Sequence, residues 1–513
     1  MNHGSLEYRA AKVSLVTGIS TGLSVAFQLI SVPICLRYWG QETYGSWLVL
    51  FSSFLLLRSL DAGYVAYVGN KLNYLYHQNT QALREHLASA VTGIALIGSM
   101  QLLLAAGAMM SDWLATIFGL PSGDTAGELD MLGLVVLMLS WVLSGSYVGI
   151  VHRLMIPAGL MYQAAWWSMV FQVSQFAAII AASILQLSIF KTCILFALLQ
   201  VVIYLTSAIY VRMKLPSYYP WWQGVSLGTG LRDLSQSVIL TVSNLLRQGA
   251  TNGVVLLVSA LAGPVAVPVF TTVRTISNLW TNVTNVLTTP LLPDVVRFHA
   301  KGEAPKLIAI TGAHWVVVGS AVNLGVLLVY PLIPVVYGYW TGHIVTLDKA
   351  LLCLLLGSVV LTNAGSLMEM HLNGINSLRI VLGVSTVRGV IGLGVGALTY
   401  GSLGLAGFGL GILMGEIFAL LMTGGFFIKY ELADKGLVMP TAVYAPTALG
   451  TISVMFFLAN DGFGWLPTLW VWPVTLVGVI CGAVGGWIRL DQDLRIRLMR
   501  MITSRFAGIS GGM

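Results

Sequence analysis

Charged side chains are scarce in this chain of 513 residues: only 9% are Asp, Glu, Lys or Arg, whereas 57% are hydrophobic. Soluble globular proteins carry about 25% charged residues. A chain so poor in charge cannot cover a globular surface with polar groups, so most of its surface must face lipid. The composition therefore predicts a polytopic membrane protein. The formal net charge of +7 does not indicate a nucleic-acid partner, because the positions of the basic residues follow membrane topology instead.

Cysteine and catalytic motifs are also scarce. The four cysteines lie far apart in apolar segments, with the spacing of neither a metal site nor a short disulfide framework, and we expect buried thiols: Cys35, Cys193, Cys353 and Cys481. No nucleotide-binding glycine loop or nucleophile elbow occurs. The runs GLGVG (392–396) and GFGLG (407–411) lie inside apolar stretches, where close helix packing explains them better than phosphate binding. The sequence thus predicts neither an enzyme nor a bound metal or cofactor.

Long apolar runs are what the chain does have. A helix needs about 20 apolar residues to cross a hydrocarbon core about 30 Å thick. Fourteen stretches meet this requirement, at 12–36, 44–67, 87–110, 131–151, 160–185, 189–211, 238–262, 265–290, 308–336, 350–370, 379–400, 403–428, 441–459 and 466–488.

Lysine and arginine in the short connecting segments predict the orientation of these spans. With a cytoplasmic N-terminus and alternating spans, 19 of the 26 basic residues fall on the cytoplasmic side. Three fall outside, Arg37, Lys191 and Lys349, and four lie within spans. We therefore expect a multi-pass membrane protein with both termini in the cytoplasm.

A weak internal repeat divides the chain. RYWGQETYGSWLVLFSS (37–53) joins the first two spans, and ALAGPVAVPVFTTVRTI (260–276) joins the seventh and eighth, so that Gly40 and Gly263 correspond. Internal repeats are typical of transporters. The predicted organisation has an N-terminal six-helix lobe (1–212), a cytoplasmic linker (213–237), a C-terminal six-helix lobe (238–428), and helices 13 and 14 with a cytoplasmic amphipathic tail (429–513).

Polar residues recur at helical spacing in the first two spans of each lobe. In the eighth span Thr271, Arg274, Asn278, Asn282 and Asn285 step by three or four residues, so they share one helical face. The seventh span repeats this pattern with residues that include Asn244, Arg247 or Gln248, and Thr251. Lone serines and asparagines in membrane helices usually bond a neighbouring helix. Stripes at matching repeat positions that also carry arginine favour a polar cavity.

Intramembrane charges refine this prediction, since an arginine at the bilayer centre costs roughly 2.5–3.5 kcal/mol. Arg247, Arg274 and Arg388 lie near the midplane, as does Glu416, whereas Asp61 and Glu369 lie nearer the cytoplasmic side. Structural pairs are one interpretation, Arg58 with Asp61 and Arg388 with Glu416. The other is a cationic cavity that attracts an anion, for which phosphate suits the guanidinium fork.

Two segments carry a family resemblance. CLRYWGQETYGSWLVLFSSFLLLRSLDAG in the first lobe, and NLLRQGATNGVVLLVSALAGPVAVPVFTTVRTISNLW followed by PLLPDVVRFHAKGE in the second, resemble the Wzx-type flippases. These form the polysaccharide-transporter branch of the multidrug/oligosaccharidyl-lipid/polysaccharide (MOP) exporter superfamily. The resemblance covers nearly the whole chain in hydropathy and helix order. It implies an all-α fold with two pseudo-symmetric lobes in a V shape, like that of the MATE transporters, and alternating access.

The resemblance also implies a function. A polyprenyl-diphosphate-linked oligosaccharide, the repeat unit of O-antigen or an exopolysaccharide, would move from the cytoplasmic to the periplasmic leaflet of the bacterial cytoplasmic (inner) membrane, driven by an H⁺ or Na⁺ gradient or by the membrane potential. Membrane lipids and a polysaccharide polymerase are the other expected partners. The expected substrate-binding residues are Arg58, Asn244, Arg247, Arg274, Asn278, Asn282 and Arg388. The expected ion-coupling or gate residues are Asp61, Glu369 and Glu416.

Two other functions compete with this one. A multidrug or cation antiporter of the same superfamily should favour carboxylates over arginines in its cavity, and the central helices here do the reverse. A membrane polysaccharide polymerase would need large external catalytic loops, whereas every predicted external loop is about 20 residues or shorter.

Overall fold

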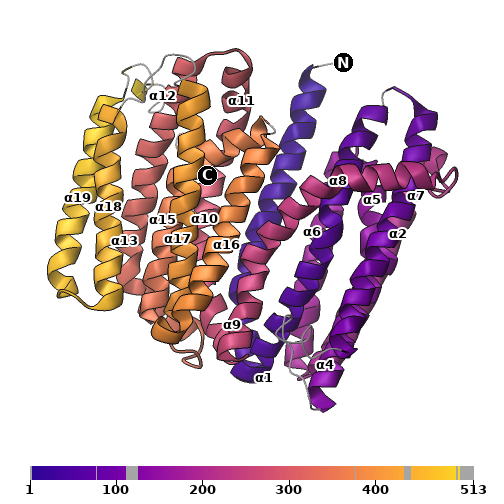
Figure 1. The fold of residues 1–513 in the computed structure, drawn as a ribbon, viewed down its shortest axis with the longest axis horizontal. Coiled ribbons are helices and arrows are strands. Elements are labelled where there is room, and N and C mark those ends of the chain that lie inside the picture. Colours follow the sequence, from indigo (N-terminus) through magenta and orange to yellow (C-terminus); the bar gives the residue numbers. More distant parts are fainter. Residues whose placement is uncertain are drawn as a thin grey trace, which may run out of the picture. The chain divides into compact units, whose positions relative to one another are not determined.

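The computed structural model describes residues 3–76, 78–110, 125–375, 377–432, 441–490, 492, 495 and 496, and every regular element in these ranges is helical (Figure 1). Most of the predicted external loop 111–130 and of the predicted amphipathic tail lies outside the described residues. The main helices are α1 (His3–Tyr76), α2 (Thr80–Met110), α4 (Thr125–Ser140), α5 (Tyr147–Arg153), α6 (Met161–Ile184), α7 (Ile189–Lys214), α8 (Leu227–Gln248), α9 (Val254–Ala262), α10 (Ala266–Thr288), α11 (Leu292–Ala300), α12 (Ala304–His314), α13 (Ser320–Val329), α14 (Ile333–Trp340), α15 (Lys349–Gly374), α16 (Leu378–Leu403), α17 (Leu405–Phe427), α18 (Thr441–Phe463) and α19 (Thr468–Arg489).

Short π-helical segments continue four of the spans. They are η1 (Trp141–Ser146) between α4 and α5, η3 (Gly249–Gly253) between α8 and α9, η5 (Trp315–Gly319) between α12 and α13, and η7 (Ile428–Leu432) after α17. Short π segments inside α-helices occur frequently at functional sites. Of these four, η1 lies at the site described below.

The fourteen predicted spans are all helical in the structure, which is therefore the predicted all-α membrane fold. By length and hydropathy alone, twelve described helices can cross a membrane. The difference has two causes. The first two predicted spans run on as one element, α1, and α10 is not apolar enough because it carries Arg274 and three asparagines.

Gly40 and Gly263 adopt nearly the same unusual backbone conformation. Gly40 bends α1 at φ 76° and ψ 178°, and Gly263 separates α9 from α10 at φ 80° and ψ 165°. Side chains other than hydrogen disfavour this region of positive φ. The two glycines that correspond in the sequence repeat thus share one backbone conformation.

The chain divides into two compact units. The first contains Met1–Thr271 with Gly338–Thr346, and the second contains Thr272–Tyr337 with Leu347–Met513. In the first unit α1 packs against α2, α6 and α8, and α4 packs against α7. In the second unit α17 packs between α15 and α16, and α18 pairs with α19 (Figure 1).

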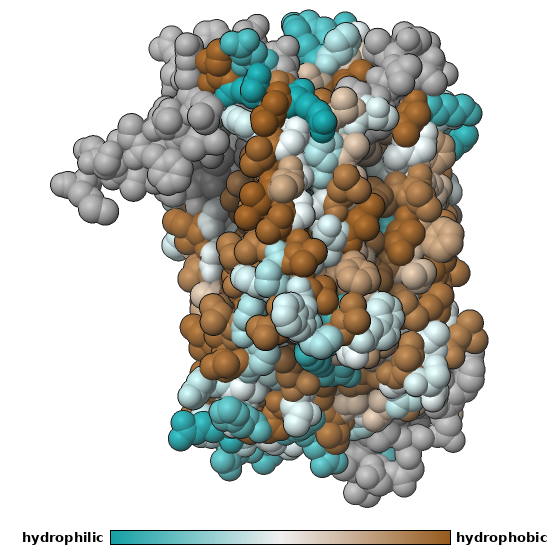
Figure 2. Space-filling view, turned by 90° about the vertical axis from the view of Figure 1, so that its left-hand side faces the viewer, coloured by the Kyte–Doolittle hydropathy of each residue, from teal (hydrophilic) through white to brown (hydrophobic). Residues whose placement is uncertain are grey.

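The face formed on the α18 and α19 side is mostly hydrophobic over its middle and hydrophilic towards its two ends (Figure 2). Large exposed apolar side chains on these helices include Leu449, Ile452, Leu469, Trp470 and Val474. Such a band is what a lipid-facing surface requires, because lipid tails replace water around the spans.

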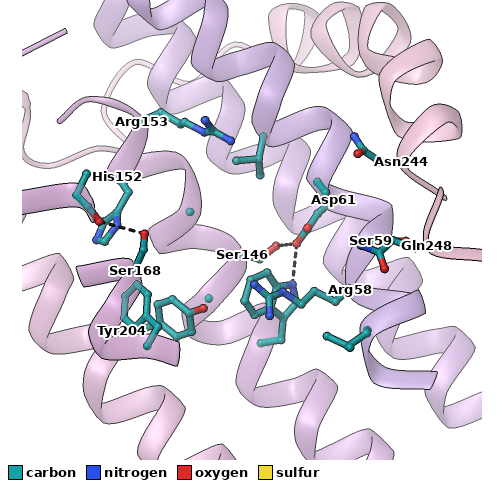
Figure 3. Close-up of a pocket in the computed structure, with 18 of the residues that line it drawn as sticks. Arg58, Ser59, Asp61, Ser146, His152, Arg153, Ser168, Tyr204, Asn244 and Gln248 are labelled. Carbon is teal, nitrogen blue, oxygen red and sulfur yellow. Dashed lines mark hydrogen bonds between the residues drawn. The ribbon is translucent and has the colours of Figure 1, made fainter. Parts of the chain in front are cut away.

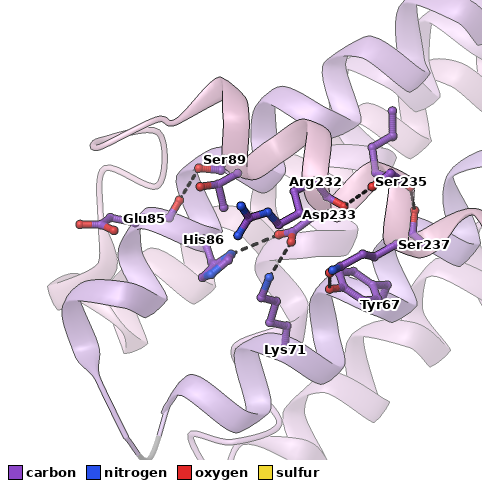
Figure 4. A network of polar contacts seen from close by, with 12 residues as sticks. Tyr67, Lys71, Glu85, His86, Ser89, Arg232, Asp233, Ser235 and Ser237 are labelled. Atoms are coloured by element: carbon purple, nitrogen blue, oxygen red, sulfur yellow. Dashed lines mark hydrogen bonds and ion pairs between the residues drawn. The ribbon is translucent and has the colours of Figure 1, made fainter.

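An ion-pair network fixes the first turns of α8 to the end of α1 and the start of α2 (Figure 4). Asp233 of α8 is only 1% exposed, and it accepts from Lys71 Nζ at 2.6 Å while His86 Nδ1 lies 3.1 Å away. The backbone N–H of Ser226 donates to Ser89 Oγ at 3.1 Å. These contacts hold the helix whose later turns reach the candidate site.

Candidate functional site

A cavity of about 640 Å³ lies within the first unit (Figure 3). We call it the arginine cavity. Its walls come from α1, η1, α5, α6, α7 and α8, and it combines apolar surface with converging polar groups, as ligand pockets do. The polar and aromatic side chains that line it are Arg58, Ser59, Asp61, Trp141, Ser146, His152, Arg153, Ser168, Phe171, Tyr204, Asn244 and Gln248.

Asp61 binds two residues of the π-helical segment η1. Trp141 Nε1 donates to Asp61 Oδ2 at 2.7 Å, and the Ser146 hydroxyl donates to the same oxygen. In an α-helix, residues five apart point about 140° away from each other. A π-turn, closed by i→i+5 hydrogen bonds, brings them towards the same side. The π-helical segment therefore lets both side chains reach one carboxylate, which is 2% exposed.

Trp141 in turn supports Arg58. The guanidinium carbon of Arg58 lies 3.8 Å from the centroid of the Trp141 ring, a close cation–π contact. No described residue forms a hydrogen bond or an ion pair with Arg58, so the Trp141 indole supports the flat face of the guanidinium while the guanidinium N–H donors remain unused by the described residues. Arg58 is a cation oriented at the wall of a cavity and able to accept an anionic ligand.

Arg153 is the second cation of the cavity. It ends α5, and its side chain crosses α1 at Gly69, where a Cβ would lie 2.7 Å from Arg153 Cδ. A methyl group at this position would force the Arg153 side chain to shift. Arg153 is half-buried and, like Arg58, forms no hydrogen bond or ion pair with a described residue. Two arginines with unused donors thus line one cavity.

Aromatic rings form a continuous row along the wall. Trp141 and Tyr204 have ring centroids 5.7 Å apart, Tyr204 and Phe171 4.2 Å, and Phe171 and His152 5.7 Å. Such rings offer apolar faces with a polar edge, which suits the alternating apolar and hydroxyl surfaces of a sugar.

Helix α8 adds amides to the same wall. Asn244 and Gln248 lie one turn apart and both line the cavity, and Asn252 Nδ2 donates to Gln248 Oε1 at 2.6 Å. Amides donate and accept hydrogen bonds without adding charge, so they can bind hydroxyl groups. The neighbouring Arg247 side chain is exposed and does not line this cavity.

The structure thus brings together three of the expected substrate-binding and gate residues: Arg58, Asp61 and Asn244. Arg274, Asn278 and Asn282 lie on α10, and apart from the boundary residue Thr271 this polar face belongs to the second unit. Their roles in substrate binding stay predictions.

The remaining three predicted residues form a charged triad in the second unit. Arg388 of α16 donates from both terminal nitrogens to Glu369 of α15, at 3.1 and 2.8 Å. Arg388 Nε also lies 2.8 Å from Glu416 Oε1 on α17. The structural pairing of Arg388 with Glu416 therefore exists, with Glu369 as an additional, bidentate partner. Two carboxylates share one guanidinium within membrane spans.

The other structural pair considered from the sequence, Arg58 with Asp61, does not form as an ion pair. Asp61 instead accepts hydrogen bonds from η1, and Arg58 lies on the Trp141 ring. The physical reason is that the π-turn brings uncharged donors to the carboxylate from another helix, which sequence spacing along α1 cannot indicate.

Sequence reasoning missed several members of the cavity, above all Arg153, Trp141, Ser146 and Tyr204. Arg153 is one of the 19 basic residues that the topology places on the cytoplasmic side, and it does end its helix, but its side chain extends over Gly69. A tryptophan and a serine five residues apart do not share a face of an α-helix. No pattern in the sequence therefore indicated their common partner.

No protein-family model and no curated protein sequence matches the chain. Its fold does match solved structures. The lipid II flippase MurJ in an inward closed conformation aligns with a TM-score of 0.68 and 14% identity, over 92% of this chain and 98% of that one. An inward-facing multidrug resistance MATE family transporter of the MOP superfamily aligns with a TM-score of 0.61 and 16% identity, over 80% and 96%.

A further match is a MOP superfamily transporter from Pyrococcus furiosus, with a TM-score of 0.53 and 16% identity over 82% of this chain and 95% of that one. The chain is therefore a multi-pass membrane protein with a transporter fold. More narrowly, that fold is shared with the lipid II flippase MurJ and with a MATE family transporter of the MOP superfamily.

Proposed function

We propose that this protein is a flippase that moves a polyprenyl-diphosphate-linked oligosaccharide, the repeat unit of O-antigen or an exopolysaccharide, from the cytoplasmic to the periplasmic leaflet of a bacterial inner membrane. One observation carries the proposal: Arg58 and Arg153 line the same cavity with their hydrogen-bond donors unused by the described residues. An intramembrane cation is costly unless an anion or water compensates it. A guanidinium binds phosphate through two parallel hydrogen bonds, which makes a diphosphate a fitting ligand.

The rest of the cavity supports the glycan part of this substrate. The aromatic row from Trp141 to His152 offers stacking surfaces, and Asn244, Gln248 and Ser168 offer neutral donors and acceptors. MurJ, which has a similar fold, is a lipid II flippase. A lipid-linked substrate for the present chain accords with that likeness.

The other residues predicted from the sequence have places in this proposal. Arg274, Asn278 and Asn282 on α10, with the exposed Arg247 on α8, would contact the substrate along its path. The triad around Arg388 and the Asp61 carboxylate would couple transport to an H⁺ or Na⁺ gradient or respond to the membrane potential. A polysaccharide polymerase is the partner we propose for the released product.

A multidrug or cation antiporter is the second candidate, because a MATE family transporter shares the fold. A cationic drug would need an available carboxylate in the cavity. Asp61 is the acidic residue that lines it, and its Oδ2 already accepts two hydrogen bonds. The arginines, by contrast, have unused donors, and this difference favours an anionic substrate.

Reconstitution into liposomes tests the proposal. A short-chain polyprenyl-diphosphate oligosaccharide is supplied on one side, and its transfer is followed by loss of accessibility to a membrane-impermeant glycosidase. We expect transfer by the wild type and at least a tenfold slower rate for Arg58→Gln with Arg153→Gln. The matched control is Lys191→Gln, which removes an exposed charge outside the cavity. Equal rates for the double variant and the control, at equal protein content, would refute the proposal.

A further inference from the structure

The two arginines of the cavity lie at different depths along α1. Arg58 belongs to α1, and Arg153 crosses the same helix at Gly69. Eleven residues separate these two levels, which corresponds to about 16 Å, or about three helical turns. α1 bends only at Gly40, outside this stretch. In Figure 3 the two guanidinium groups accordingly lie apart, with Asp61 and Ser146 between them.

A single diphosphate is too short to contact both levels at once. Two phosphoryl groups joined by one oxygen are far shorter than three helical turns. The same cavity is also suited to sugars, since Tyr204, Phe171 and Asn244 among its lining residues offer rings and an amide. A ligand that engages both arginines must therefore be extended and must carry negative charge at two separated points.

We infer that the preferred substrate is a diphosphate-linked glycan that contains an acidic sugar, with the diphosphate at one arginine and the sugar carboxylate at the other. This inference rests on the proposed function and names the chemical class of its glycan. A neutral glycan would leave one arginine of the cavity without an anionic partner, and that cation would remain poorly compensated.

Asp61 does not remove the need for a second anion. Its carboxylate lies in the same cavity, but it forms no ion pair with Arg58 and accepts hydrogen bonds from Trp141 and Ser146. It can moderate the cost of an empty cavity through its charge, while the donors of Arg58 stay available. Among the described lining residues, two arginines with unused donors thus face one carboxylate, which already accepts hydrogen bonds from Trp141 and Ser146.

Two soluble probes test the inference on the purified full chain. Both are farnesyl-diphosphate-linked trisaccharides, one of neutral hexoses only and one with a single glucuronic acid. Hydrogen bonds to charged groups contribute about 1.5–3 kcal/mol, which is roughly a tenfold or larger change in affinity. We expect the wild type to bind the acidic probe at least tenfold more tightly than the neutral one, as measured by calorimetry.

The single variants then assign the arginines. In one of Arg58→Gln and Arg153→Gln the preference for the acidic probe should disappear while the affinity for the neutral probe stays unchanged. In the other variant both affinities should fall together. Gly69→Ala displaces Arg153 without removing its charge and should behave as Arg153→Gln does; Gly228→Ala, where a Cβ meets nothing within 4 Å, is its control.

Two results would overturn the inference while leaving the proposed function intact. One is equal affinity of the wild type for both probes. The other is an equal loss of affinity for both probes in each arginine variant, which is expected if one diphosphate moves between two successive positions. Binding of neither probe above that of the same trisaccharide without diphosphate would overturn the proposed function and the inference together.

Discussion

The indole N–H of Trp141 donates to Oδ2 of Asp61 over 2.7 Å. This bond joins α1 to the π-helical segment η1. The face of the same indole ring supports the Arg58 guanidinium. In the proposed function Asp61 would therefore act on substrate binding by positioning Trp141, which in turn supports Arg58.

Replacement of Asp61 separates positioning from charge. In Asp61→Asn the side-chain oxygen can still accept from Trp141 and Ser146, so we expect affinity for a polyprenyl-diphosphate glycan within about threefold of the wild type. Asp61→Leu leaves two buried donors unsatisfied, at a cost of about 1–3 kcal/mol each, and should weaken binding at least tenfold. If Asp61 also couples transport to an ion, Asp61→Asn will bind normally but lose the pH or sodium dependence of its transport rate. Equal binding by the Leu variant and the wild type would contradict the positioning role.

The charged triad of the second unit gives a prediction about stability. Arg388→Gln removes the shared partner of Glu369 and Glu416 and should destabilise the protein by about 1–3 kcal/mol, less than for a fully buried pair because all three side chains keep some exposure. Glu416→Gln retains the bidentate contact with Glu369 and removes the surplus carboxylate, so it should unfold close to the wild-type temperature in detergent. A larger loss for Glu416→Gln than for Arg388→Gln would show that the second carboxylate, not the guanidinium, is what the site needs.

The network at the start of α8 gives a second stability prediction. Asp233→Asn removes the charge that holds Lys71 and is expected to cost roughly 3 kcal/mol, because the carboxylate is buried. Glu303→Gln breaks an exposed pair with Lys306 and should cost below about 0.5 kcal/mol. Thermal unfolding of both variants in the same detergent provides the comparison. Indistinguishable midpoints would mean that α8 is held by packing alone.

The polar face of α10 gives a prediction about transport. Arg274→Ala with Arg247→Ala should insert at normal abundance yet lower glycan export at least tenfold, because a guanidinium can bind phosphate or carboxylate through two donors. Arg→Lys at both positions should restore export only in part, since a point charge replaces a planar fork. Wild-type export by the double alanine variant would leave this polar face a role in helix packing only.

The sequence by itself determined the membrane class, the helical spans and the repeat. Hydropathy over stretches of about 20 residues depends on local composition, so the order of residues along the chain is enough to locate the spans. Gly40 and Gly263 were recognisable because positive φ selects glycine at each turn independently. The shared face of Arg274, Asn278 and Asn282 followed from helical periodicity alone.

Only the tertiary structure decided which residues meet. Arg153 enters the cavity because Gly69, on another helix, leaves space for its side chain, and composition gives no signal for such a contact. Trp141 and Ser146 converge on Asp61 because one segment is π-helical, which changes the direction of every side chain relative to an α-helix. Arg58 is available to a ligand because those uncharged donors, rather than its own charge, satisfy the nearby carboxylate. Each of these facts depends on distances between segments far apart in the chain, and such distances are set by packing rather than by local pattern.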